Sequence, residues 1–296
     1  MEFYKSAIYN RFMTAEISRR RFVTMAGVAA AGLLLPESEG LDRAGNRNEL
    51  NQFLAQPFEL TQPLRDSVGN LLELVGKDKT SDLGFAHNAN TLDRFERSIE
   101  DMRRQVVEID CRIDGEGPYI AHDKGGKSDI DPLTAYDIVV SSPYGKALKY
   151  DFKEADAIGG VLSSIDPDRP CILNADLFHN SGFNLTPEEF VGQSKKYENA
   201  LLSIGKNGEF KDDEAVVDFV QQFIRLAKTN TRRDFILPAP LIGFMNYFEE
   251  LKNVLALPNT HLMIYRTSDI TLTQRHVNWV KESFSDDIRA RTFFDL

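Results

Sequence analysis

The sequence contains few cysteines. Its 296 residues include only two, Cys111 and Cys171, which is too few for a disulfide framework. Both fall in short apolar runs that we expect to be strands, so we predict two free, buried thiols. Stability must therefore come from a hydrophobic core, and the 42% of hydrophobic residues is sufficient to build one.

Positive charge is also scarce. The formal net charge is −10, and because residues 1–35 hold five basic and two acidic residues, the rest of the chain carries −13. Proteins that bind nucleic acids need clustered Lys and Arg to neutralise the phosphates. The charge balance therefore argues against a nucleic acid as partner, but it does not exclude a small phosphate ester held through a metal ion.

No apolar run is long enough to span a bilayer comfortably, which takes about 20 residues. The run Val23–Leu35 follows Ser18–Phe22, SRRRF, which resembles the twin-arginine export signal. We therefore predict a signal segment at residues 1–35 and a periplasmic or extracellular location. No A-x-A cleavage site stands near Leu35-Pro36, so the segment could be retained as an N-terminal anchor with peripheral membrane contact. The alternative is a basic N-terminal helix of a cytosolic protein.

A G-x-G-x-x-G motif is missing from the first strand–helix turn, which weakens a dinucleotide-binding open sheet. Residues 36–80 predict a polar linker with one or two short helices, and from Leu83 onward apolar, strand-like runs alternate with amphipathic segments. This alternation, with eight strands, predicts a (β/α)8 TIM barrel over residues 81–296 in preference to a doubly wound sheet. The predicted strands are Leu83–His87, Gln105–Cys111, Ala147–Phe152, Cys171–Leu177, Ala200–Ile204, Phe235–Ala239, His261–Tyr265 and Ile288–Asp295. The predicted helices are Thr91–Arg104, Pro132–Val140, Ala155–Ser164, Pro187–Glu198, Glu214–Lys228, Asn246–Ala256 and Thr273–Phe284, with caps at Thr91, Thr186 and Thr271.

The second predicted strand carries the most informative pattern, Glu108-Ile109-Asp110. Residues two apart on a strand share a face, with α-carbons roughly 6.5–7 Å apart. Two carboxylates on one face of an apolar run repel each other and resist burial. A divalent cation with oxygen ligands is the simplest way to offset that cost, and the alternative is an ordinary solvated sheet face.

Polar residues also stand at the predicted C-terminal ends of other strands, where (β/α)8 barrels carry their chemistry. Asp151 ends the third strand and, with Glu108 and Asp110, can supply three oxygen ligands for Mg²⁺, or alternatively Ca²⁺. A metal ion there is therefore expected as the cofactor.

Histidines provide the candidate proton-transfer groups. His87 follows the first strand and His122 lies in the loop after the second, so they are candidates for a general base and a general acid. Lys153 shares a face with Asp151 and can neutralise charge on a phosphoryl oxygen. Each of these residues alone has a structural alternative, as a hydrogen-bonded histidine or a surface lysine. Weaker candidates, for substrate binding, are Asn174, Asp176 and Arg266.

As an ordered set, H…(E-x-D)…H-D…(D-x-K) resembles the phospholipase-C-like phosphodiesterase superfamily, which includes glycerophosphodiester phosphodiesterases and spider-venom type sphingomyelinases D. The D-x-K spacing is that of the sphingomyelinase D type, whereas Asn88 stands where glycerophosphodiesterases have Arg-Gly. The resemblance implies a Mg²⁺ site with two catalytic histidines, formed by His87, Glu108, Asp110, His122, Asp151 and Lys153.

A closer resemblance is to the menorin family, a branch of this superfamily, and it extends from about Leu83 to the C-terminus. The motifs that carry it are His87–Asn90, Glu108–Asp110, Ala121-His122, Lys149–Lys153, Leu173–Asp176 and Phe294–Leu296.

These features together lead us to expect a Mg²⁺-dependent phosphoric diester hydrolase or lyase that acts on a phospholipid head group or a glycerophosphodiester by two-histidine acid/base catalysis. One alternative is a non-catalytic menorin-like barrel that binds a partner outside the cytoplasm. A weaker alternative is a metal-dependent sugar or aldol-type barrel enzyme. All six matched positions carry competent side chains, which favours the phosphodiesterase. The sequence does not indicate the oligomeric state.

Overall fold

The computed structural model describes residues 66–126, 128–178, 183–206, 210–267 and 270–296. The predicted signal segment, residues 1–35, and residues 36–65 of the predicted linker lie outside the described residues. Among the residues that are described, no helix has both the length and the apolar character needed to cross a bilayer.

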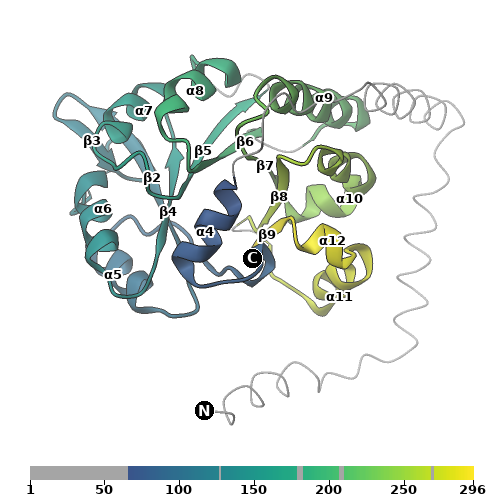
Figure 1. Ribbon diagram of the computed structural model, residues 1–296, viewed down its shortest axis with the longest axis horizontal. Helices are drawn as coiled ribbons and strands as arrows, with labels where there is room; N and C mark the ends of the chain where they lie inside the picture. Colours follow the sequence, from purple (N-terminus) through teal and green to yellow (C-terminus); the bar gives the residue numbers. More distant parts are fainter. Residues whose placement is uncertain (1–65, 127, 179–182, 207–209, 268–269) are drawn as a thin grey trace, which may run out of the picture. The chain divides into compact units, whose positions relative to one another are not determined.

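Eight parallel strands form a nearly closed barrel with helices around its outside (Figure 1). The path of hydrogen-bonded strands runs β1-β2-β4-β5-β6-β7-β8-β9, and we call the junction between its two ends, β1 and β9, the seam. The (β/α)8 barrel predicted from the sequence is confirmed. Its strands are β1 (Phe85–Ala86), β2 (Val106–Asp114), β4 (Ala147–Phe152), β5 (Cys171–Phe178), β6 (Ala200–Lys206), β7 (Phe235–Pro240), β8 (Thr260–Tyr265) and β9 (Thr292–Asp295).

The helices between successive parallel strands cover the outer face of the barrel, and several begin at capping residues visible in the sequence. The hydroxyl of Thr91 accepts the backbone N–H of Arg94, and Thr186 forms a capping box with Glu189. The α-helices are α5 (Leu92–Glu100), α6 (Pro132–Ser141), α7 (Ala155–Leu162), α8 (Pro187–Gln193), α9 (Asp213–Thr229), α10 (Leu241–Leu251), α11 (Gln274–Ser283) and α12 (Asp286–Arg289).

Several boundaries differ from the sequence prediction, and three of these differences lie where a helix or strand begins. Helix α10 begins five residues early, directly after Pro240, whose fixed φ suits a position just before a helix. The cap of α11 is Thr273 and not Thr271. The last strand starts at Thr292, because the hydroxyl of Ser285 caps the short helix α12, which takes up Ile288.

A hairpin follows β2 where the sequence suggested only a loop. Strand β3 (Gly117–Ile120) pairs antiparallel with β2, and Gly117 turns the chain with a φ of 129°, a conformation that favours glycine. The carboxylate of Asp114 accepts the N–H groups of Glu116 and Gly117. The pairing continues to Ala121, whose N–H donates to the carbonyl of Asp110 at 3.0 Å, and this fixes where the next residue leaves the barrel.

The N-terminal end of the barrel interior is apolar. One buried side chain comes from each of the eight strands, and we call this set the lower layer. Helix α4 (Ser67–Val75) lies across the centre of the ring of strands in Figure 1 and adds Leu71 and Val75 to the same cluster. The lower layer is Phe85, Val106, Ala147, Ile172, Leu201, Ile236, Met263 and Phe293.

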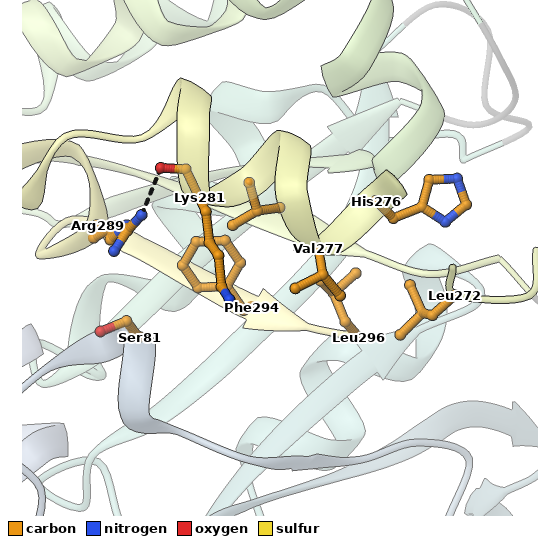
Figure 2. Close-up of a pocket in the computed structure, with 9 residues that line it drawn as sticks. Ser81, Leu272, His276, Val277, Lys281, Arg289, Phe294 and Leu296 are labelled. Carbon is orange, nitrogen blue, oxygen red and sulfur yellow. Dashed lines mark hydrogen bonds between the residues drawn. The ribbon is translucent and has the colours of Figure 1, made fainter. Parts of the chain in front are cut away.

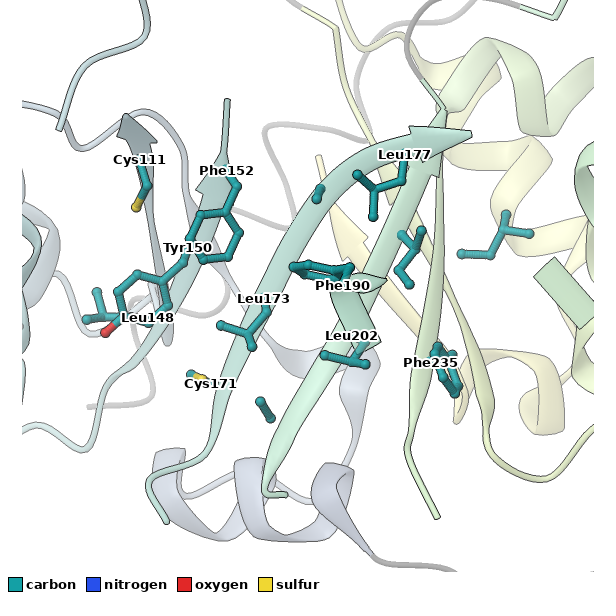
Figure 3. Close-up of a cluster of buried hydrophobic side chains, with 14 of the residues drawn as sticks. Cys111, Leu148, Tyr150, Phe152, Cys171, Leu173, Leu177, Phe190, Leu202 and Phe235 are labelled. Atoms are coloured by element: carbon teal, nitrogen blue, oxygen red, sulfur yellow. The ribbon is translucent and has the colours of Figure 1, made fainter. Parts of the chain in front are cut away.

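The outward-facing side chains of the strands pack against the helices in a second, larger core. Figure 3 shows part of it, with Tyr150 and Phe152 of β4 near Leu173 of β5. Cys111 and Cys171 belong to this core as free, buried thiols, which confirms that prediction.

Candidate active site

Two residues beyond the lower layer, the inward-facing positions change character. Successive side chains of a strand alternate between faces, so these positions point into the barrel at its C-terminal end. Seven of the eight are polar or charged, and Pro238 is the exception. We call this set the upper layer: His87, Glu108, Lys149, Asn174, Ser203, Tyr265 and Asp295, with Asp110, Asp151 and Asp176 two residues further along their strands.

Four residues of the upper layer form a closed ring of ion pairs across the seam. Glu108 accepts from Lys149 Nζ at 2.6 Å, and its other oxygen lies 3.4 Å from His87 Nδ1. His87 Nε2 is 2.6 Å from Asp295 Oδ1, and Lys149 Nζ is 3.6 Å from Asp295 Oδ2. Glu108, Lys149 and Asp295 are all buried, so their charges stabilise one another out of bulk water.

Asp110 and Asp151 form a second group, held by Lys153. Lys153 Nζ lies 2.8 Å from Asp110 Oδ1 and 2.6 Å from Asp151 Oδ2. Asn174 donates to the other oxygen of Asp151 at 2.7 Å, and Ser203 in turn donates to Asn174 at 2.5 Å. A continuous polar chain therefore runs across four neighbouring strands.

The loop after β1 supports Asp110. Asn88 has a φ of 51°, a left-handed conformation that asparagine tolerates better than most residues. After this turn, Asn90 accepts the backbone N–H of Asp110 at 3.0 Å and donates to its carboxylate at 2.5 Å. The position of the Asp110 carboxylate is thus set from both its backbone and its side chain.

Burial and charge shift the pKa values of these groups in opposing directions. Burial alone would lower the pKa of His87, but hydrogen bonds and charges from Asp295 and Glu108 outweigh it and raise that pKa to about 10. Burial would raise the pKa of Glu108, yet Lys149 and His87 hold it well below its usual range. For Asp151, burial prevails over the nearby lysines and raises the pKa to about 6. His87 is therefore an imidazolium at neutral pH and lies between the carboxylates of Glu108 and Asp295.

Three carboxylates in the upper layer meet the requirements of a divalent-cation site. Glu108, Asp110 and Asp151 each offer an oxygen, and these atoms lie within 4.8 Å of one another. Hard oxygen donors in this number suit Mg²⁺. The ammonium of Lys153 lies between two of these carboxylates, Asp110 and Asp151, and supplies a positive charge there. A second set with the same spacing is His87, Glu108 and Asp295, in which the imidazole would have to release its proton before it coordinated a metal.

His122 stands apart from this centre. Its side chain is 63% exposed, and its ring pairs, among the described residues, with Asp123 alone, at 3.0 Å from Nδ1. Arg112 donates to the backbone carbonyl of His122, and the hairpin places the preceding Ala121 beside Asp110. His122 therefore lies at the rim next to the acidic group, without contacting His87 in this conformation.

The three weaker candidates lie in different surroundings. Asn174 belongs to the polar chain described above. Asp176 is mostly buried, and burial raises its pKa against the pull of Lys153 and Lys149. A side chain at Gly205 would come within 2.3 Å of Asp176 Oδ1, so the glycine leaves room for that carboxylate. Arg266 lies outside both ion-pair groups and lines a cavity at the seam.

Two cavities flank the seam, and Leu296 lines both. The first, of about 290 Å³, is mainly apolar and is bordered by Leu272, Val277 and Phe294 (Figure 2). The second, of about 420 Å³, is polar and is lined by His87, arginines of α5 and Arg266. We call these the apolar cavity and the seam cavity.

Several residues of the centre have no assigned role in the sequence prediction. Lys149, Asp295 and Asn90 fall inside motifs that carry the menorin resemblance, but spacing along the chain did not indicate which carboxylate each would meet. The i, i+2 relation of Lys149 to Asp151 was the available signal, because it places both on the inner face. Asp295 could be assigned only once β9 was known to lie beside β1.

The fold and the site together define the class of this protein. It is a (β/α)8 barrel with a centre of lysine-paired carboxylates at the C-terminal ends of its strands. The chain belongs to the menorin family, since the model of the Menorin N-terminal domain matches residues 79–272. The family resemblance predicted from the motifs is thereby confirmed.

Comparison with solved structures finds similarity to a glycerophosphoryl diester phosphodiesterase from Parabacteroides distasonis. The match has a TM-score of 0.48 and 12% sequence identity, and it covers 78% of this chain and 88% of that one. Comparison with curated proteins gives no significant match. We therefore base the functional proposal on the residues of this chain.

Proposed function

We propose that this protein is a phosphodiesterase, a Mg²⁺-dependent phosphoric diester hydrolase or lyase, that acts on a phospholipid head group or a glycerophosphodiester at the upper layer. The observation that carries the proposal is the convergence of Glu108, Asp110 and Asp151, whose ligand atoms lie within 4.8 Å of one another, beside one imidazolium and two ammonium groups. Anionic and cationic groups gathered at the open end of a barrel suit a reaction in which charge builds on phosphoryl oxygens.

The three carboxylates would hold the metal ion. Mg²⁺, or alternatively Ca²⁺, would polarise the phosphoryl group and neutralise part of its charge when bound. Lys153 is 24% exposed, so its flexible side chain can leave Asp110 and Asp151. Its ammonium is then available to pair with an oxygen of the substrate phosphate.

The two histidines take different parts in proton transfer. His87 carries a proton at neutral pH, with a pKa raised to about 10 by Asp295 and Glu108, so it suits the general acid that protonates the leaving group. The contact of Asp123 with His122 Nδ1 orients the ring and leaves Nε2 as the atom that would accept a proton. His122 is therefore the proposed general base for the attacking hydroxyl, from water or from the substrate itself. Asn174 and Asp176 are proposed to border the bound substrate.

One observation favours the non-catalytic alternative. Glu108, Asp110 and Asp151 each already contact a lysine, and ion pairs of this kind also occur as purely structural networks. In that case the protein is a binding barrel, and neither metal binding nor turnover is expected.

Loss of His122 tests the catalytic proposal. We expect His122→Ala to lower release of choline or glycerol from a panel of phosphodiesters by about 10²–10⁴-fold, and EDTA to abolish wild-type release. The matched control is His276→Ala on α11, outside the upper layer. Unchanged turnover in a folded His122→Ala variant would remove His122 from the mechanism.

Metal binding separates the two candidate functions. Isothermal titration with Mg²⁺ should show binding that Asp110→Asn weakens by about 10–100-fold. Asp114→Asn, an exposed aspartate at the far end of the same strand, should bind as the wild type does. Absence of wild-type binding at millimolar Mg²⁺ would favour the non-catalytic barrel.

We also propose that the protein acts outside the cytoplasm, because the Ser18–Phe22 pattern precedes an apolar run in the sequence. Substitution of Arg19, Arg20 and Arg21 by Lys should retain the protein in the cytoplasmic fraction of the expressing bacterium. Export of this variant at the normal level would exclude the twin-arginine route.

A further inference from the structure

We propose that the seam cavity is a second site that binds a phosphate anion, next to the proposed catalytic centre, with which it shares His87. Four arginines line it, Arg94, Arg97 and Arg104 from the α5 region and Arg266 from the loop after β8. His87 completes the lining. Basic side chains are concentrated here in a chain whose net charge is −10, which makes the cavity a local attractor for anions.

The one acidic residue of the cavity is already neutralised. Asp101 forms a two-point ion pair with Arg103, with distances of 2.9 and 2.8 Å, and Arg103 does not line the cavity. The pair lowers the pKa of Asp101 to about 2. Its second neighbour, Arg104, has its Nε 4.0 Å away. The carboxylate therefore cancels little of the positive charge in the cavity.

Two of the arginines are positioned by neutral backbone carbonyls, which do not compensate their charge, and the one carboxylate near either of them is Asp101, 4.0 Å from Arg104 among the described residues. Arg94 donates to the carbonyl of His87 at 2.8 Å, and Arg104 donates to the carbonyl of Phe85. These contacts fix each guanidinium beside β1 and leave its other N–H groups available. Arg97 pairs with Asp93, but both side chains are more than 70% exposed, so that pair is weak.

Arg266 approaches from the opposite side of the seam. Its backbone N–H donates to the carbonyl of Asp295 at 3.2 Å, which anchors the residue at the end of β9. Its guanidinium is exposed and pairs with no carboxylate in the part of the chain that the structure describes. Guanidinium groups that line one polar cavity from both sides of the seam match the several oxygens of a phosphate, which accepts forked hydrogen bonds.

The size of the cavity leaves room for the group that carries the phosphate. Its volume is about 420 Å³, and Leu296 lines both this cavity and the apolar cavity. The phosphate could therefore be free or could belong to the head group of an anionic lipid, whose chain has apolar surface beside it (Figure 2). The recognition chemistry is the same for both sources.

Calorimetric titration of the full-length protein with inorganic phosphate, at low ionic strength and in EDTA, tests the site. We expect Arg94→Ala/Arg266→Ala to bind phosphate at least about tenfold more weakly than the wild type. The conservative Arg94→Lys/Arg266→Lys variant, which keeps the charge but loses the forks, should fall between the two. Arg275→Ala, an exposed arginine of α11 outside this cavity, should leave binding unchanged.

Vesicle flotation distinguishes the two sources. Retention on phosphatidylglycerol vesicles but not on phosphatidylcholine vesicles, lost in the alanine double variant and with no binding of free phosphate, would support the site with a lipid head group as its ligand. The site is overturned if wild-type protein binds neither phosphate nor anionic vesicles, or if the double variant binds both normally. EDTA keeps these outcomes independent of the proposed metal site, so loss of turnover and loss of anion binding are separate results.

Discussion

The lower and upper layers of the barrel are built by the same eight strands, two residues apart, yet they solve opposite physical problems. In the lower layer every inward side chain is apolar, and Leu71 and Val75 of α4 complete the packing. In the upper layer Glu108, Lys149 and Asp295 are almost as inaccessible to water, although all three carry charge.

The two layers differ in how their side chains affect the stability of the fold. Apolar burial is favourable wherever packing is tight, so the lower layer stabilises the fold without any specific partner. A buried charge is unfavourable unless its partner is present, so the upper layer depends on each of its members. Charged residues that are buried at the open end of a barrel and depend on one another in this way are candidates for a functional centre.

Breaking one ion pair in the upper layer should have the largest effect on stability. Lys149→Met leaves Glu108 buried without its 2.6 Å partner, and we expect the free energy of unfolding to fall by about 3–5 kcal/mol. Urea denaturation monitored by circular dichroism measures the loss. Lys252→Met, which removes an exposed pair with Glu249, should cost no more than about 0.5 kcal/mol.

The double variant Glu108→Leu/Lys149→Met sharpens this comparison. Removing both charges leaves no unpaired group, so much of the lost stability should return, while Mg²⁺ binding should not. A double variant as unstable as Lys149→Met would mean that the site tolerates the charges better than it tolerates apolar side chains.

A cavity in the lower layer should have a somewhat smaller effect. Leu71 is fully buried, and Leu71→Ala should lower the free energy of unfolding by about 2–4 kcal/mol through lost burial and incomplete repacking. Mg²⁺ affinity should stay at the wild-type value, because Leu71 packs in the lower layer, at the opposite end of the barrel from the carboxylates. Leu133→Ala, at a position that is 47% exposed on α6, should be within about 0.5 kcal/mol of wild type. A marked loss of Mg²⁺ affinity in Leu71→Ala would show that the two layers are coupled.

The lower layer and the strands could be predicted from the sequence because they consist of apolar side chains in short runs. Apolar runs such as Ala147–Phe152 report burial directly, and the observed β4 has the same bounds. The predicted boundaries were wrong where local capping decides them, as at Ser285, whose hydroxyl caps a helix that extends into the run Ile288–Asp295 expected to be a strand. The β2–β3 hairpin was missed because it depends on the backbone freedom of Gly117, which composition does not reveal.

The upper layer could be predicted from the sequence only in part. Glu108, Asp110, Asp151 and Lys153 were proposed as partners from their i, i+2 spacing, and the structure brings all four together. Their actual pairing could not be derived, because it depends on which strands become neighbours and on shear between them. For the same reason the contact of His87 with Asp295, about 200 residues away, has no signal in the spacing.

The smallest expected effect concerns the pH dependence of the upper layer. His87 has its pKa raised from 6.5 to about 10 in the folded protein, so the folded state holds a proton that the unfolded state releases above pH 6.5. Stability contributed by His87 is therefore complete below pH 6.5 and is lost as the pH rises toward 10. The difference in unfolding free energy between wild type and His87→Gln should accordingly shrink across this window. Because the side chain is 38% exposed, we expect a change of only about 1 kcal/mol.

Chemical denaturation at pH 6, 8 and 9.5 measures this difference, and His276→Gln supplies the control for loss of a histidine that makes no ion pair in the described part of the chain. Subtracting the variant removes the contribution of Asp151, whose raised pKa acts below this window. A difference that grows with pH would require a lowered pKa at His87 and would show that burial outweighs the two carboxylates. The imidazole would then be neutral near pH 7, and the assignment of His87 as the proton donor would have to be exchanged with that of His122.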